Sequence, residues 1–100
     1  MADLTDPDEC RKLVDSTINK FKKLNHFVNC ANLWSNANIT DENIVTKYHH
    51  IMDTNMRSVV LLTHLCAQHL DKTGGNIILL SGFASLRPVS IKCTLLALYE

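Results

Sequence analysis

The chain has 100 residues, of which 46% are hydrophobic and 20% charged, and ten basic residues balance ten acidic ones. This length allows one small domain with a modest core, and the composition is that of a globular chain rather than a disordered one. The balanced charge gives no reason to expect nucleic acid or a membrane surface as a partner. No apolar run reaches the roughly 18 residues of a membrane helix and no signal peptide is recognised, so we expect a cytoplasmic protein.

The cysteines and histidines do not form a metal-binding pattern. Cys66 and His69 share a helical face and His49 adjoins His50, but neither pair has the third ligand that a zinc site requires. We therefore expect no metal. Because no CxxC spacing occurs and the surroundings are apolar, we expect reduced thiols in or near the core at all four cysteines: Cys10, Cys30, Cys66 and Cys93.

The first predicted helix begins at the stretch Asp6-Pro7-Asp8-Glu9. Asp6 can cap it, Pro7 suits the first helical position, and Glu9 can reach back to close a capping box. Apolar residues then recur at helical spacing over about 18 residues, as far as Leu24. Residues 26–31 read as a short strand, and an Asn- and Ser-rich loop covers residues 32–38.

A second, long helix is predicted from Thr40, which can cap it, to about Leu70, before the helix exit at Gly74-Gly75. Residues 76–81 are apolar on both faces and predict a fully buried strand of a parallel sheet. Residues 82–92 form a predicted loop, and residues 93–100 can begin a third helix.

The predicted order of elements is that of an α/β fold with parallel strands: helix, strand, long helix, strand and short helix. Two such strands joined by a crossover helix are a partial Rossmann-like, doubly wound unit, about half of a nucleotide-binding sheet. We expect residues 1–100 to be one partial domain of this kind.

Four short stretches, in this order, resemble the central part of the short-chain dehydrogenase/reductase family. Asp3-Leu4 resembles the Asp-Val pair that ends the third strand of the family. Residues 27–32, Phe-Val-Asn-Cys-Ala-Asn, resemble its Val-Asn-Asn-Ala-Gly turn after the fourth strand. Residues 52–59 resemble the long-helix segment centred on its catalytic asparagine, and residues 75–88 resemble its fifth strand and catalytic-serine loop.

The resemblance implies hydride transfer between NAD or NADP and a carbonyl or alcohol carbon. It places five residues on the cofactor side: Asp3, Asn29, Cys30, Ala31 and Asn32. Two of these depart from the turn of the family. Asn32 replaces a glycine and can keep a left-handed conformation, whereas Cys30 replaces an asparagine and loses the hydrogen bonds of the amide.

Asn55 corresponds to the family's relay asparagine, and it also lies on the core-facing stripe of the predicted long helix. A carboxamide on such a stripe must find hydrogen-bond partners, because leaving it unpaired costs about 1–3 kcal/mol. Two alternatives remain open on the sequence. Asn55 either bonds to neighbouring backbone as a core asparagine, or it holds a water in a proton relay.

The remaining catalytic pattern of the family is incomplete. Its serine position aligns with Gly82, and Ser81, one residue earlier, is expected to face the opposite side of the strand. Its tyrosine position aligns with Leu95. The sequence contains two tyrosines, Tyr48 and Tyr99, and Tyr99 is the other candidate for the catalytic tyrosine. The family has a lysine four residues after its tyrosine. Met52 stands at that position for Tyr48, and the position lies past residue 100 for Tyr99.

Three hypotheses follow from these departures. The first is a fragment or truncated member of the family, without its N-terminal Gly-rich βα units and its C-terminal part, that is inactive alone. The second is a non-catalytic interaction module that pairs, through the helix of residues 41–70, with a full-length relative. The third is an independently active reductase with an unusual site.

Overall fold

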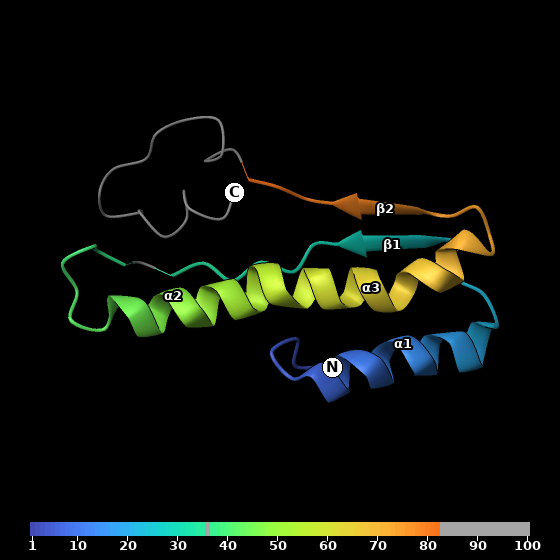
Figure 1. The fold of residues 1–100 in the computed structure, drawn as a ribbon, viewed down its shortest axis with the longest axis horizontal. Helices are drawn as coiled ribbons and strands as arrows, with labels where there is room; N and C mark the ends of the chain where they lie inside the picture. The colour runs from blue at the N-terminus through green and yellow to red at the C-terminus, as the bar shows by residue number, and fades with distance from the viewer. Residues whose placement is uncertain (36, 83–100) are drawn as a thin grey trace.

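The structure is a computed structural model that describes residues 1–35 and 37–82. The predicted loop after residue 82, the third helix, Cys93, Leu95 and Tyr99 lie outside the described residues. The elements follow the predicted order along the chain (Figure 1). They are α1 (Pro7–Phe21), β1 (His26–Asn29), α2 (Ile44–Met52), the π-helical segment η1 (Asp53–Arg57), α3 (Ser58–Asp71) and β2 (Asn76–Leu79).

Helix α1 begins as predicted, with Pro7 in its first turn and Asp6 as its cap. The Asp6 carboxylate accepts the backbone N–H of Asp8 at 2.8 Å. The predicted capping box is wrong, because the Glu9 carboxylate accepts the N–H of Asp3 instead. The helix also ends earlier than predicted, since Lys22 takes a left-handed conformation with φ 62° and its N–H bonds to the carbonyl of Ile18.

The predicted long helix is present as α2, η1 and α3, which follow one another without a break from Ile44 to Asp71. Its predicted start at Thr40 is wrong: Asn43 occupies the cap position and makes no side-chain capping bond. The Asp41 carboxylate bonds to the preceding turn instead, where it accepts the N–H of Asn38 at 3.1 Å. It also accepts a hydrogen bond from the Lys47 ammonium at 2.7 Å. The helix ends close to the predicted exit, where Gly74 has φ 60°.

Strands β1 and β2 pair in parallel, with Phe27 opposite Ile77 and Val28 opposite Ile78, which confirms the α/β class. Both arrows point the same way in Figure 1, with α3 beside β1 and α1 beside α3. The prediction of a fully buried second strand is wrong, because Ile78 is 44% and Leu79 55% exposed. Among the described residues, α3 packs on β1, α1 packs on α3, and β2 pairs with β1.

The main core fills the space between α1, α3 and β1. Its buried side chains are Cys10, Val14, Leu62, Cys66 and Leu70, with Phe27 and Leu24 packed against them. Burial raises the pKa of the Cys10 and Cys66 thiols. The prediction of a core position is wrong for Cys30, which follows the end of β1 and is exposed; Cys10, Cys30 and Cys66 are all free thiols. None of the described helices has the length and apolarity needed to cross a membrane.

Gly75 lies where the chain leaves α3 and passes the start of β1. Its N–H bonds to the carbonyl of Leu70 at 2.8 Å, and a Cβ at this position would lie 2.3 Å from the carbonyl oxygen of Asn25. Asn25 directly precedes β1, and its backbone cannot move aside as a side chain could. A side chain at position 75 therefore has to push the two strands apart where His26 pairs with Asn76.

We expect Gly75→Ala to lower the free energy of unfolding by about 2 kcal/mol or more, because it forces backbone apart. Gly74→Ala is the matched control: nothing lies within 4 Å of its Cβ, so only its positive φ is penalised, by about 1 kcal/mol. Urea unfolding followed by circular dichroism measures both. A larger loss for Gly74→Ala than for Gly75→Ala would contradict the close approach.

Candidate functional site

A cavity of about 150 Å³ lies at the carboxyl ends of β1 and β2. Ligands of open α/β sheets bind outside these ends of the strands. Its lining includes six residues that the sequence singled out: Asn29, Ala31, Asn32, Asn55, Ser81 and Gly82. The structure therefore brings together three of the predicted cofactor-side residues, the predicted relay asparagine and both residues at the serine position.

Asn55 is 6% exposed and lies in η1. Its Oδ1 accepts the backbone N–H of Leu33 at 2.7 Å, and its Nδ2 donates to the carbonyl of Leu33 at 2.8 Å and to Oδ1 of Asn32 at 3.3 Å. The amide thus pairs with both backbone groups of one residue in the loop after β1. These are the partners of a core asparagine bonded to neighbouring backbone; the relay role stays a prediction.

The segment around Asn55 is π-helical, which the sequence did not predict. The N–H of Ser58 bonds to the carbonyl of Asp53, five residues earlier. The Ser58 hydroxyl, on a residue 1% exposed, donates to the carbonyl of Thr54, and the Thr54 hydroxyl donates to the carbonyl of His50 at 3.1 Å. Two hydroxyl residues four apart, each able to bond back onto the preceding turn, are the only sequence signal for this distortion.

The residues at the end of β1 and just after it do not all face the cavity. Asn29 is 8% exposed and lines the cavity, as do Ala31 and Asn32, and the carbonyl of Asn29 accepts the N–H of Leu80 at 3.1 Å. Cys30 is exposed and does not contribute to the lining. The structure therefore separates Cys30 from the other residues of the predicted cofactor-side turn.

Asp3 also lies apart from the cavity lining. Its Oδ1 accepts the hydroxyl of Thr5 at 2.7 Å and the N–H of Thr5 at 2.8 Å, and these two bonds hold the pKa of the Asp3 carboxyl below its ordinary value. The carbonyl of Thr5 accepts a hydrogen bond from Arg57, the last residue of η1. Asp3 is connected to the segment that carries Asn55, but by way of Thr5 and Arg57.

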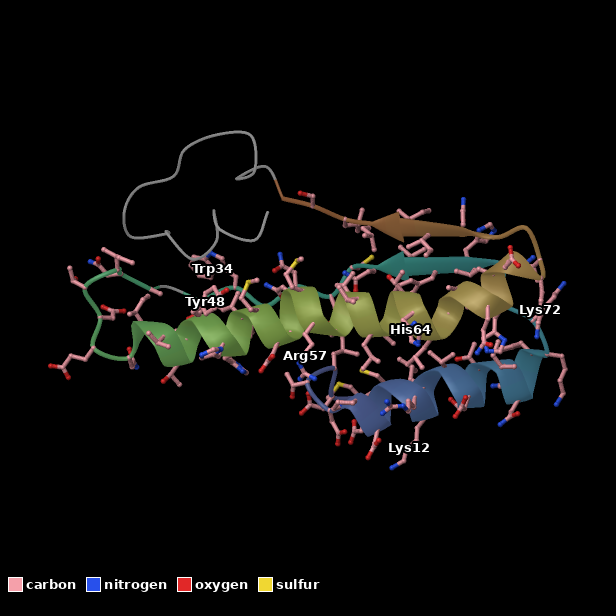
Figure 2. The ribbon with its side chains drawn as sticks, viewed as in Figure 1. Lys12, Trp34, Tyr48, Arg57, His64 and Lys72 are labelled. Atoms are coloured by element: carbon pink, nitrogen blue, oxygen red, sulfur yellow. The ribbon has the colours of Figure 1, made fainter. Side chains whose placement is uncertain are left out.

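Tyr48 lies on α2 (Figure 2). Its ring packs edge-to-face against that of His49, with centroids 5.6 Å apart. It does not line the cavity, and the residue four positions later is Met52. Within residues 1–35 and 37–82, no three His, Cys, Asp or Glu side chains are grouped as metal ligands would be.

A family model for short chain dehydrogenases matches residues 1–94. The chain is 36% identical to an 11-beta-hydroxysteroid dehydrogenase A of Sesamum indicum, over 87% of this chain and 25% of that protein. It is 35% identical to the protein of the same name from Arachis hypogaea, over 99% of this chain and 30% of that protein. The chain thus spans about a quarter to a third of these curated relatives.

Solved structures give the same fold. The chain superposes on the NADH-dependent reductase A1-R' complexed with NAD with a TM-score of 0.83 and 25% identity, covering 98% of this chain and 43% of that one. For a short-chain dehydrogenase/reductase from Serratia marcescens the TM-score is 0.89 at 21% identity, over 98% of this chain and 44% of that one. The chain belongs to the short-chain dehydrogenase family.

Proposed function

We propose that this chain supplies the central part of the dinucleotide-binding surface of an oxidoreductase, which transfers hydride between NAD or NADP and a carbonyl or alcohol carbon. The observation that supports this most directly is the cavity at the ends of the two parallel strands. Its lining combines the turn residues Asn29, Ala31 and Asn32 with Asn55, whose amide binds the loop that follows the same turn.

The cavity fits only part of such a cofactor. Its volume of about 150 Å³ is below the roughly 300–1,000 Å³ of pockets that enclose a ligand of this size. The three glycines of the sequence, Gly74, Gly75 and Gly82, do not form the Gly-rich turn that binds a pyrophosphate. Asn29, Ala31 and Asn32 would hold one end of the dinucleotide, which supplies or accepts the hydride.

We further propose that the chain does not catalyse hydride transfer alone. A tyrosine titrates near pH 10, and a neighbouring cation has to lower its pKa before it can exchange a proton near neutrality. Met52 stands four residues after Tyr48, and Leu95, at the position that the resemblance gives to the catalytic tyrosine, has no phenol group. Ser81 adjoins the cavity, but a hydroxyl without that acid/base pair can only orient a carbonyl group.

The test of the cofactor surface is a titration of the chain with NADH and NADPH, followed by two-dimensional amide NMR. We expect weak binding, with a Kd on the order of 1 mM, because only part of the site is present. The signals that shift should be those of Asn29, Ala31, Asn32 and Asn55. Shifts confined to residues outside the cavity, or none at saturating nucleotide, would contradict the proposal.

The role of the Asn55 amide is tested by Asn55→Ala. This change leaves the partly buried N–H and carbonyl of Leu33 without their partner, so we expect a loss of about 2–4 kcal/mol in the free energy of unfolding. Asn43→Ala is the matched control, since Asn43 is exposed and makes no side-chain capping bond. Equal losses in urea unfolding for the two variants would show that the Asn55 bonds do not hold the loop.

The second candidate function is pairing with a full-length relative through the long helix. Val45 on α2 is 63% exposed and Val60 on α3 is 64% exposed. Two large apolar side chains exposed on one helix are a candidate contact surface for another helix. The free thiols of Cys10, Cys30 and Cys66 support a cytoplasmic location for either function.

For this candidate we expect co-expression with a full-length relative to give a complex, and Val60→Glu to weaken it at least tenfold by placing a charge in an apolar contact. Ile39→Glu, at a residue 54% exposed in the loop before α2, is the control and should leave the complex intact. Sedimentation velocity measures both. Equal affinity of the Val60→Glu and unaltered chains would exclude this surface.

A further inference from the structure

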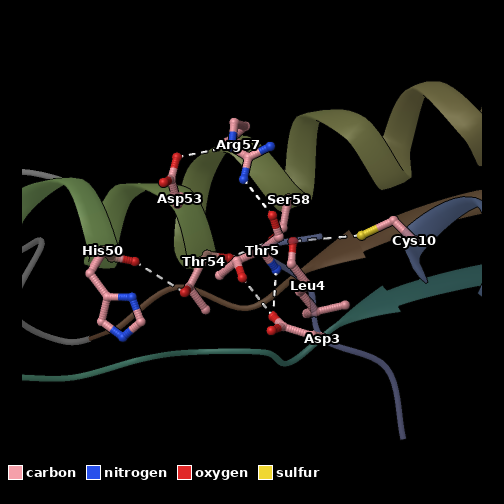
Figure 3. A network of polar contacts seen from close by, with 9 residues as sticks. All are labelled: Asp3, Leu4, Thr5, Cys10, His50, Asp53, Thr54, Arg57 and Ser58. Atoms are coloured by element: carbon pink, nitrogen blue, oxygen red, sulfur yellow. Dashed lines mark hydrogen bonds and ion pairs between the residues drawn. The ribbon is translucent and has the colours of Figure 1, made fainter. Parts of the chain in front are cut away.

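Arg57 makes two hydrogen bonds, one within η1 and one to the loop before α1 (Figure 3). Its Nε donates to Oδ1 of Asp53 at 2.9 Å, one helical turn earlier, and its Nη2 donates to the backbone carbonyl of Thr5 at 2.7 Å. Thr5 in turn gives its N–H and its hydroxyl to Oδ1 of Asp3. Asp53, Arg57, Thr5 and Asp3 therefore form one continuous chain of contacts.

The same short segment also holds the loop beside the cavity. Residues two apart on a helix point in different directions. Accordingly, the side chain of Asn55 bonds to Leu33, in the loop after β1, while the side chain of Arg57 bonds to Thr5, in the loop before α1. The two loops are thus fixed to one short helical segment, η1.

The contacts of Asp3 leave part of its carboxylate available. Oδ1 takes both bonds from Thr5, and among the described residues Oδ2 has no hydrogen-bond partner. The side chain is exposed, and a carboxylate oxygen held in this way is an acceptor for the hydroxyl and amino groups of a nucleoside. Thr5 binds this carboxylate, and Arg57 binds the carbonyl of Thr5.

We propose that Arg57 is a positioning residue for nucleotide binding: it fixes the loop of Asp3 relative to the cavity beside Asn55, so that Asp3 can accept a hydrogen bond from a nucleotide whose other end occupies that cavity. This role rests on the proposed function. Arginine suits it because its planar group can bond to Asp53 and to Thr5 at the same time, whereas the single ammonium of a lysine cannot keep both geometries.

The first experiment needs no nucleotide. In Arg57→Gln, the carbonyl of Thr5 loses its partner, so the Asp3 carboxyl should lose its two bonds from Thr5 in part of the population. We expect the pKa of Asp3, followed by carboxyl-carbon NMR, to rise toward its ordinary value, and the Thr5 amide to exchange about tenfold faster. His50, which also lowers the pKa of Asp3, and Glu9, which binds the Asp3 N–H, remain in place in the variant.

The control is Arg11→Gln, which breaks a more exposed ion pair, Arg11 with Asp8 at 3.2 Å, and should change neither the pKa of Asp3 nor the exchange of the Thr5 amide. In Arg57→Lys we expect smaller changes than in Arg57→Gln, both in the pKa of Asp3 and in the exchange rate of the Thr5 amide. Unchanged Leu33 and Asn55 amide signals show that the variants are folded, and Arg57→Lys takes the place of Arg57→Gln if the latter does not fold. A pKa of Asp3 and a Thr5 exchange rate equal to those of Arg11→Gln would overturn the proposal.

The second experiment repeats the NADH titration on the same variants. We expect Arg57→Gln to bind about threefold to tenfold more weakly than the unaltered chain and to lose the shift of the Asp3 signal, while the signals at the cavity still move. Equal affinity in Arg57→Gln and the unaltered chain would overturn the positioning role and leave Arg57 as a structural tie. An unaltered chain that does not bind NADH would refute the proposed function, and the first experiment would still decide whether Arg57 positions Asp3.

Discussion

The pairing of the Asn55 amide with both backbone groups of Leu33 is the contact on which the candidate site depends. Residues 30–35, after β1, have no regular secondary structure, and a loop of this kind keeps its shape only if its backbone polar groups are bonded. A buried carboxamide with a donor and an acceptor aimed at one residue fixes position and orientation together. The cavity at the ends of the strands exists in this form because the loop is held to the helix.

Asn55 makes this contact from a stretch of the helix that is locally widened. In η1 the hydrogen bonds span five residues, as in the bond from Ser58 to Asp53, so one additional residue is accommodated between α2 and α3. Such a widening rotates the side chains before it relative to those after it. Asn55 and Arg57 lie within the segment, which allows one short stretch of chain to bind the loops on two sides.

The sequence was sufficient for the elements and their order, and for the family. The Asp6-Pro7 start, the helix exit near Gly74 and the apolar strand after it are local signals, and they predict the parallel pair correctly. The errors arise where a side chain had a choice of partners. Glu9 and Asp41 both suit a helix start, but each bonds to backbone outside its helix, and sequence spacing does not reveal which partner a carboxylate takes.

The exposure of β2 depends on which strands and helices flank it, and the apolar pattern of its own residues does not predict those neighbours. The shared lining by Asn29, Ala31, Asn32 and Asn55 was predictable only through the family resemblance, because the residues come from segments more than twenty positions apart.

The register of the sheet has a consequence for how this chain folds. His26 lies opposite Asn76, and the two side chains meet across 50 positions of sequence. Every contact within the sheet therefore closes a loop of about this length, and the entropy of closing it is lost before the strands gain any bonds. The hydrogen bonds within α1 and α3, in contrast, join residues that are close in the sequence. We infer a sequence of events in which the helices form early and the sheet is completed last, only when residues 76–79 have reached the edge of β1.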